Sequence, residues 1–219
     1  MRALLVMLLL LAVPAQAAET LLRLSETAHV AARPDELVAM LRADGSAATA
    51  AAAQGRVNVA IARALDEAKA VPGVVAATGV YNVWQRPPPN LQWQAQQTVQ
   101  LKGSDGAAML ALVGSLQASG LAVDRLGWQV SAVAGRKVQS EATKLALAAL
   151  RGRAEEAAAI LGLKFVGFRE IRLDSQRPVI MAMPAPRTLM AAQDVAAPRA
   201  EANEVDITAT VEADAMLSP

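Results

Sequence analysis

The sequence has no cysteine and only one histidine among its 219 residues. The missing cysteine excludes disulfides, thiolate metal sites, cysteine nucleophiles and a lipid-modified cysteine. A single histidine excludes any zinc site that needs two of them. Basic and acidic residues nearly balance, at 21 against 20, so no charge excess points to nucleic acid. Neither a Walker A loop nor a G-x-G-x-x-G loop occurs, and no other catalytic motif stands out.

Aromatic side chains are also scarce. Hydrophobic residues make up 54% of the chain, but 50 residues are alanine and aromatic residues account for only 3%. Alanine buries little area on folding. We therefore expect a core of aliphatic side chains packed on alanine, with few aromatic rings.

The first 17 residues have the pattern of a secretory signal peptide. Met1-Arg2 gives a short positive start, residues 3–13 are apolar, and Ala15 and Ala17 are the small residues of an A-x-A cleavage site. The apolar run is shorter than the roughly 20 residues that a spanning helix needs. An uncleaved anchor is the alternative. The pattern predicts export, cleavage after Ala17 and a single mature domain over residues 18–219.

Hydrophobic periodicity in the mature chain predicts an α+β fold. Helical spacing indicates two long Ala-rich helices, over residues 47–70 and 138–161, and a shorter helix over 107–118 that Asp105 caps. Because several strands have a polar face, we expect mixed or antiparallel sheets with helices on one side. Alternation indicates strands over residues 21–32, 74–84, 91–102, 122–133, 163–173 and 203–213, with a shorter one around Leu37–Leu41 that ends at an Asp44-Gly45 turn.

The residues most often used in catalysis have simpler interpretations in this sequence. His29 lies on the polar face of a strand and lacks a partner in sequence. Ser140 and Lys144 are one helical turn apart, but a serine in mid-helix lacks the exposed turn on which such nucleophiles sit. We expect these side chains to be surface groups. The same holds for two pairs of adjacent carboxylates on the helices, Asp66-Glu67 and Glu155-Glu156.

Residues 174–200 contain four prolines and three methionines without any period, which predicts a mobile loop. Met181, Met183 and Met190 are candidate thioether ligands for Cu(I), and methionines can also act as oxidant sinks. Apolar contacts within the loop are the simpler interpretation. No cofactor is expected.

Two further features are candidates for binding rather than catalysis. Trp84, Trp93 and Trp128 all fall on predicted strands and could form a sugar or peptide platform. We expect Trp93 and Trp128 in the core because their strand faces are otherwise apolar, whereas the face of Trp84 is less clear. The second feature is one face of the strand over residues 91–102, which is uncharged from Gln92 to Gln100 and carries a row of glutamines. It could stack against the sheet of another chain or simply be solvated, and its candidate interaction residues are Gln92, Gln94 and Gln96.

The order of these segments resembles the SIMPL domain family, which includes periplasmic immunogenic proteins of Gram-negative bacteria. The resemblance spans most of the mature chain, and its most specific piece is the helix end, Leu-Gly turn and strand of residues 153–167. The sequence departs from the family where Asp44-Gly45 interrupts the second strand and where three prolines occupy the hairpin at residues 87–89. The other pieces are Ala32-Arg33-Pro34-Asp35, residues 79–83, and the strand from Trp93 to Leu101.

The resemblance implies a periplasmic α+β protein that assembles into ring-like homo-oligomers and contacts other envelope proteins. Members of the family have been linked to tolerance of oxidative stress and to envelope integrity. The family has no agreed catalytic residues, so the resemblance carries no site onto this sequence. A non-enzymatic role follows as the expectation, and a small-ligand or Cu(I)-binding stress protein that uses the Met-Pro loop is the alternative.

Overall fold

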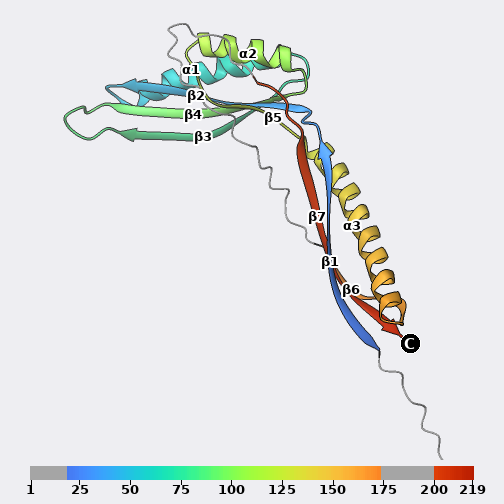
Figure 1. The fold of residues 1–219 in the computed structure, drawn as a ribbon. Coiled ribbons are helices and arrows are strands. Elements are labelled where there is room, and N and C mark those ends of the chain that lie inside the picture. The colour runs from blue at the N-terminus through green and yellow to red at the C-terminus, as the bar shows by residue number, and fades with distance from the viewer. Residues whose placement is uncertain (1–18, 174–199) are drawn as a thin grey trace, which may run out of the picture. The chain divides into compact units, whose positions relative to one another are not determined.

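The computed structural model describes residues 19–173 and 200–219, which form three helices and seven strands (Figure 1). The chain divides into two compact units. We call them the three-stranded unit, described over residues 19–28, 141–173 and 208–219, and the four-stranded unit, described over residues 29–140 and 200–207. Each unit builds its own sheet and its own core.

The three-stranded unit contains β1 (Thr20–Ala32), β6 (Lys164–Leu173) and β7 (Val205–Ser218) in the order β1-β7-β6. β6 and β7 are antiparallel. β1 also runs antiparallel to β7, since Arg23 contacts Asp214 and, further along β1, Thr27 contacts Thr210. The helix α3 (Ala132–Ile160) lies along one face of this sheet (Figure 1).

Alanine forms most of the contact between α3 and its sheet. The buried residues of the helix recur every four positions and lie along one stripe. Small side chains on such a stripe let a helix approach a sheet closely, so many weak dispersion contacts replace a few large side chains. Phe165 and Phe168 close one end of this core edge to face, with ring centroids 5.0 Å apart. The buried helix residues are Ala142, Ala146, Leu150, Ala154 and Ala158.

The four-stranded unit contains a fully antiparallel sheet in the order β3-β4-β2-β5. Both of its helices lie on the same face of the sheet (Figure 1), and the main core lies between them and the strands. Thr49 caps the first helix, and Asp105 caps the second by accepting hydrogen bonds from two backbone N–H groups. The elements are β2 (Glu36–Ala47), α1 (Ala50–Lys69), β3 (Val75–Gln85), β4 (Trp93–Gly103), α2 (Gly106–Ala118) and β5 (Ala122–Gln129).

The predicted α+β class is confirmed, with two long Ala-rich helices, one shorter helix and antiparallel sheets covered by helices on one side. The cap at Asp105 is also confirmed. Of the predicted loop over residues 174–200, all but Ala200 lies outside the described residues.

The predicted turn at Asp44-Gly45 is wrong, because β2 continues through both residues to Ala47. Gly45 is required there by packing: a Cβ at this position would lie 2.5 Å from the carbonyl oxygen of Ala53 on α1. Asp44 is held by Arg42, with 2.9 Å between Nε and Oδ2. Glycine is needed here because the strand passes close to the backbone of α1, and not because the chain turns. The local sequence does not distinguish these two reasons for an Asp-Gly pair.

The predicted boundary between the strand over 122–133 and the helix over 138–161 is also wrong. β5 ends at Gln129 and α3 begins at Ala132. Ser131 starts the helix early, since its Oγ accepts from the backbone N–H of Ala134. At the other end of the chain, β7 extends to Ser218, beyond the predicted residue 213.

We predict that Gly45→Ala lowers the free energy of unfolding by about 1–3 kcal/mol, because the new methyl group meets helix backbone that cannot move aside cheaply. Gly55→Ala on the exposed side of α1 is the matched control, since nothing lies within 4 Å of its added Cβ. This second change should stabilise the protein by about 0.5–1 kcal/mol through helix propensity. Urea unfolding measures both, and equal effects of the two changes would contradict the packing argument.

Candidate functional site

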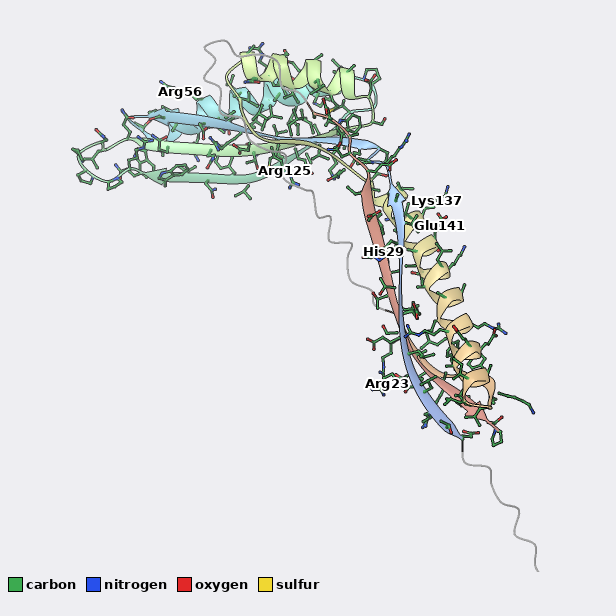
Figure 2. The ribbon with its side chains drawn as sticks, viewed as in Figure 1. Arg23, His29, Arg56, Arg125, Lys137 and Glu141 are labelled. Carbon is green, nitrogen blue, oxygen red and sulfur yellow. The ribbon has the colours of Figure 1, made fainter. Side chains whose placement is uncertain are left out.

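The residues that the sequence offers for catalysis lie at exposed positions. His29 lies on β1, as does Arg23 (Figure 2), and the nearby hydrogen bond on that face joins the hydroxyls of Thr27 and Thr210 at 2.9 Å. Ser140 and Lys144 are exposed on α3. These positions agree with the surface roles expected for the three side chains.

The paired carboxylates on the helices form ion pairs with basic residues of the same helix. Asp66 pairs with Lys69 at 3.1 Å, and Glu155 pairs with Arg151 at 2.9 Å. Glu67 accepts from Arg63 and also from Ser115 on α2, and these two hydrogen bonds lower the pKa of Glu67. The carboxylates therefore stabilise helix faces and helix contacts.

A shallow depression on the polar face of the three-stranded unit is lined by charges of both signs. Arg23 Nε lies 2.9 Å from Asp214 Oδ1, and Arg172 Nε lies 2.7 Å from Glu170 Oε1. The hydrogen bond from Arg23 lowers the pKa of Asp214. Glu212 also lines the depression, so three carboxylates face two guanidinium groups and the surface is zwitterionic with a small acidic excess.

Asp35, in the Pro34-Asp35 step that follows β1, holds the start of α3. Its carboxylate accepts from the backbone N–H of Ser131 at 2.6 Å and from the Ser131 hydroxyl at 2.8 Å. The backbone hydrogen bond is the largest cause of a lowered pKa at Asp35. Since Ser131 in turn caps α3, this short loop has a structural role.

The face of the four-stranded sheet that lies opposite α1 and α2 carries polar side chains over most of its area. We call it the open face. The odd-numbered residues of β4, such as Val99 and Leu101, are buried toward the helices, so its even-numbered residues lie on the open face. The glutamine row expected from the sequence is therefore confirmed as a row on one face. Its members from β4 are Gln94, Gln96 and Gln100.

Hydrogen bonds order the end of this face near the β3–β4 turn. Gln94 Nε2 donates to Ser46 Oγ at 2.8 Å, and Ser46 Oγ donates to Gln92 Oε1 at 2.7 Å. Gln92 precedes β4, which begins at Trp93, so the predicted strand start at residue 91 is two residues early. Farther along, Arg42 is paired with both Asp44 and Asp124, at 2.9 and 2.7 Å.

The three tryptophans separate as expected. Trp93 and Trp128 pack against the core, and Trp128 also donates from Nε1 to the carbonyl oxygen of Ala200. Trp84 on β3 is 43% exposed. The register places Trp84 opposite Gln94, on the open face. The face of Trp84, which the sequence left undecided, is thus the glutamine face.

β3 is the most exposed strand edge of the molecule's described part. Among the described strands it pairs only with β4, and nine of its 11 residues are exposed. The other three edge strands, β1, β5 and β6, all carry charged residues, whereas the sequence of β3, VAATGVYNVWQ, has none. Charges are the usual protection of an edge against pairing with another chain. Sequence reasoning missed this edge, although the absence of charge over residues 75–85 was a usable signal.

Two general features bear on ligands and membranes. Within residues 19–173 and 200–219, no group of three or more His, Asp or Glu side chains could hold a metal ion. None of the helices in those ranges is both long and apolar enough to cross a membrane. The candidate copper ligands Met181, Met183 and Met190 lie outside the described residues.

A family model described as SIMPL, a protein of unknown function (DUF541), matches residues 22–215. The match covers nearly the whole chain. The chain belongs to the SIMPL family. No curated protein matches it. The SIMPL match includes both units, the glutamine row and the uncharged edge of β3, so these features are part of the family domain in this chain.

We predict that Asp35→Asn lowers the free energy of unfolding by about 1 kcal/mol at pH 7, because an amide cannot replace both hydrogen bonds of the carboxylate. The folded-state pKa of Asp35 is lowered, so its stabilisation is complete above the unfolded pKa of about 3.9. It is lost as the pH falls through the lower folded pKa. The gap between the variant and the unmodified protein should therefore narrow below about pH 4.

Urea unfolding at pH 7 and at pH 3 measures this gap. Asp66→Asn is the control, since its ion pair with Lys69 is 75% exposed on both sides and should contribute little at either pH. A gap that stays constant with pH would show that the Asp35 carboxylate is not the stabilising group.

Proposed function

We propose that this SIMPL protein is exported to the periplasm and acts there without catalysis, by self-association through the edge of β3. The observation that carries the proposal is the combination of length, exposure and lack of charge on that edge. Val75 and Val80 on this strand are 66% and 65% exposed. Unpaired backbone groups beside exposed apolar side chains are what a second strand would cover.

We expect β3 to pair with the β3 strand of a second copy about a two-fold axis, because this arrangement covers the whole length of the strand. Such a contact is isologous, so each residue of the strand meets a residue at the same distance from the centre on the copy. Val80 is the middle residue of Val75–Gln85 and would face its own copy. The register shift between Thr78 and Tyr81 places a bulge at the centre and leaves regular strand on both sides.

The glutamine row offers a second way to associate, by stacking the open faces of two chains. Half-buried amides that are already bonded within the chain, such as Gln94 with Ser46, gain less from such stacking than the unpaired backbone of β3 does. We therefore place the main contact at the edge. Gln94 and Gln96 remain candidates for contacts with envelope proteins.

Export is supported by the signal-peptide pattern of residues 1–17. β1 begins at Thr20, so cleavage after Ala17 would remove none of the described elements. A role in envelope and oxidative stress tolerance is supported by the family resemblance. Growth of a deletion strain under peroxide, with and without the intact gene, tests that role.

We predict that Val80→Lys converts an oligomer of the mature chain into a smaller species, because two lysines would meet at the centre of the contact. Light scattering after size exclusion measures the mass. Val59→Lys is the matched control, since Val59 is 71% exposed on α1 in the same unit and should leave the mass unchanged.

The double variant Gln94→Lys, Gln96→Lys distinguishes a contact through the edge of β3 from a contact through the open face. If this pair of changes lowers the mass and Val80→Lys does not, the contact lies on the open face and the edge proposal is wrong. A monomer formed by the unmodified mature chain at all concentrations tested would reject self-association altogether.

We predict that the chain, expressed with its own first 17 residues, is recovered from the periplasm with the mass of residues 18–219. Ala17→Tyr should block cleavage by placing a large residue at the −1 position, so the product keeps the mass of the full chain. Intact mass spectrometry of the osmotic-shock fraction distinguishes the two. Recovery of the unmodified chain from the cytoplasm alone would contradict export.

A further inference from the structure

One end of the open face combines an exposed indole with hydrogen-bonding side chains, of which all but Asp44 are neutral. The strand register places Trp84, Gln94 and Ser46 in one row across β3, β4 and β2. The adjacent row on the same face consists of Asn82, Gln96 and Asp44. Rows two residues apart along a strand are separated by about 7 Å, so the two rows form one continuous patch. We call these six residues the indole–amide patch.

The patch is built from groups that complement the two kinds of surface on a sugar ring. An indole face is electron-rich and attracts the C–H groups on the flat face of a pyranose. Carboxamides carry donors and acceptors together, so each can bond to neighbouring hydroxyl groups at once. Ser46 and Gln94 are fixed by their mutual hydrogen bond, which reduces the entropy lost when a ligand binds.

The charges around the patch argue against other ligand classes. The six residues of the patch include no cation and one carboxylate, Asp44, which pairs with Arg42; Arg42 also pairs with Asp124. Arg86, two residues after Trp84 and past the end of β3, lies outside the patch. A phosphate or another polyanion would meet no unpaired cation in the indole–amide patch. A hydrophobic partner would have to desolvate the amides of Gln94, Gln96 and Asn82. A neutral ligand rich in hydroxyl and amide groups fits best.

We propose that the indole–amide patch binds the β-linked amino-sugar strand of peptidoglycan. The acetamido groups of such a strand are neutral donors and acceptors, like the carboxamides that would meet them. A flat sheet surface suits an extended polymer better than a single sugar, which would need an enclosing pocket. The choice of this glycan rests on the proposed export, because export places the protein beside peptidoglycan. The contact uses the face of the sheet, whereas the proposed self-association uses its edge.

The test compares Trp84→Ala with Tyr81→Ala in the mature chain. Both remove an exposed aromatic ring from β3, but Tyr81 pairs with Gln97 and so lies on the face opposite Trp84. The probes are the soluble tetramer of β-linked N-acetylglucosamine, followed by calorimetry, and purified peptidoglycan sacculi in a sedimentation assay. We expect Trp84→Ala to weaken binding about tenfold or more and Tyr81→Ala to change it less than about twofold.

Gln96→Ala provides a second variant that leaves the indole in place, and it should weaken binding of the tetramer by about threefold or more. Equal losses from Trp84→Ala and Tyr81→Ala, or no binding of either probe by the unmodified chain, would overturn the proposal. Light scattering of each variant keeps the two proposals distinguishable. A fall in mass with Trp84→Ala would assign that side chain to self-association and would also overturn glycan binding.

Discussion

Among the residues that the structure describes, each sheet is covered by helices on one face only, and the rest of the structure depends on that constraint. α3 covers the three-stranded sheet, and α1 and α2 cover the same face of the four-stranded sheet. A sheet with helices on one face must be apolar on that face and polar on the face exposed to solvent. This is why apolar and polar residues alternate so regularly along its strands. The described chemistry of the chain is therefore confined to surfaces: two polar sheet faces and the outer strand edges. A surface of this kind suits binding and assembly, where contact area matters more than enclosure.

The alanine-rich helices determine how closely each helix packs on its sheet. Alanine contributes little area, so a helix that buries Ala146 and Ala154 must come close enough for backbone and Cβ atoms to touch the sheet. The same demand reaches the strands, where Gly45 leaves room for the backbone of α1. Close backbone contact leaves little tolerance for added volume, because neither partner can change rotamer to relieve a clash. The stability of the protein therefore depends on close packing between the helices and the sheets.

The sequence predicts the features that are repeated locally and misses those that depend on distant contacts. Alternation identified the glutamine row of β4, and the spacing of Val57 and Ile61 identified α1, since each pattern follows from one-sided burial of a single element. Asp44-Gly45 resembled a turn because glycine serves both turns and close packing. The early start of α3 depends on Asp35, almost a hundred residues from Ser131. The edge position of β3 depends on strand order, which periodicity does not report, and so the uncharged edge and the location of Trp84 emerged only with the register.

The edge and the open face of the four-stranded sheet would reinforce each other. Pairing through β3 extends one sheet into the next and places the indole–amide patches of two chains on one continuous surface. Each patch is shallow and exposed, so a single glycan contact is expected to be weak. A polymer that spans both patches binds the second at a high effective concentration, so the combined affinity exceeds either contact alone. Weak individual contacts would let the protein move along the polymer, while assembly would keep it attached. The affinity of a shallow binding surface would then depend on oligomer formation, which joins the unprotected edge of β3 and the indole–amide patch in one physical argument.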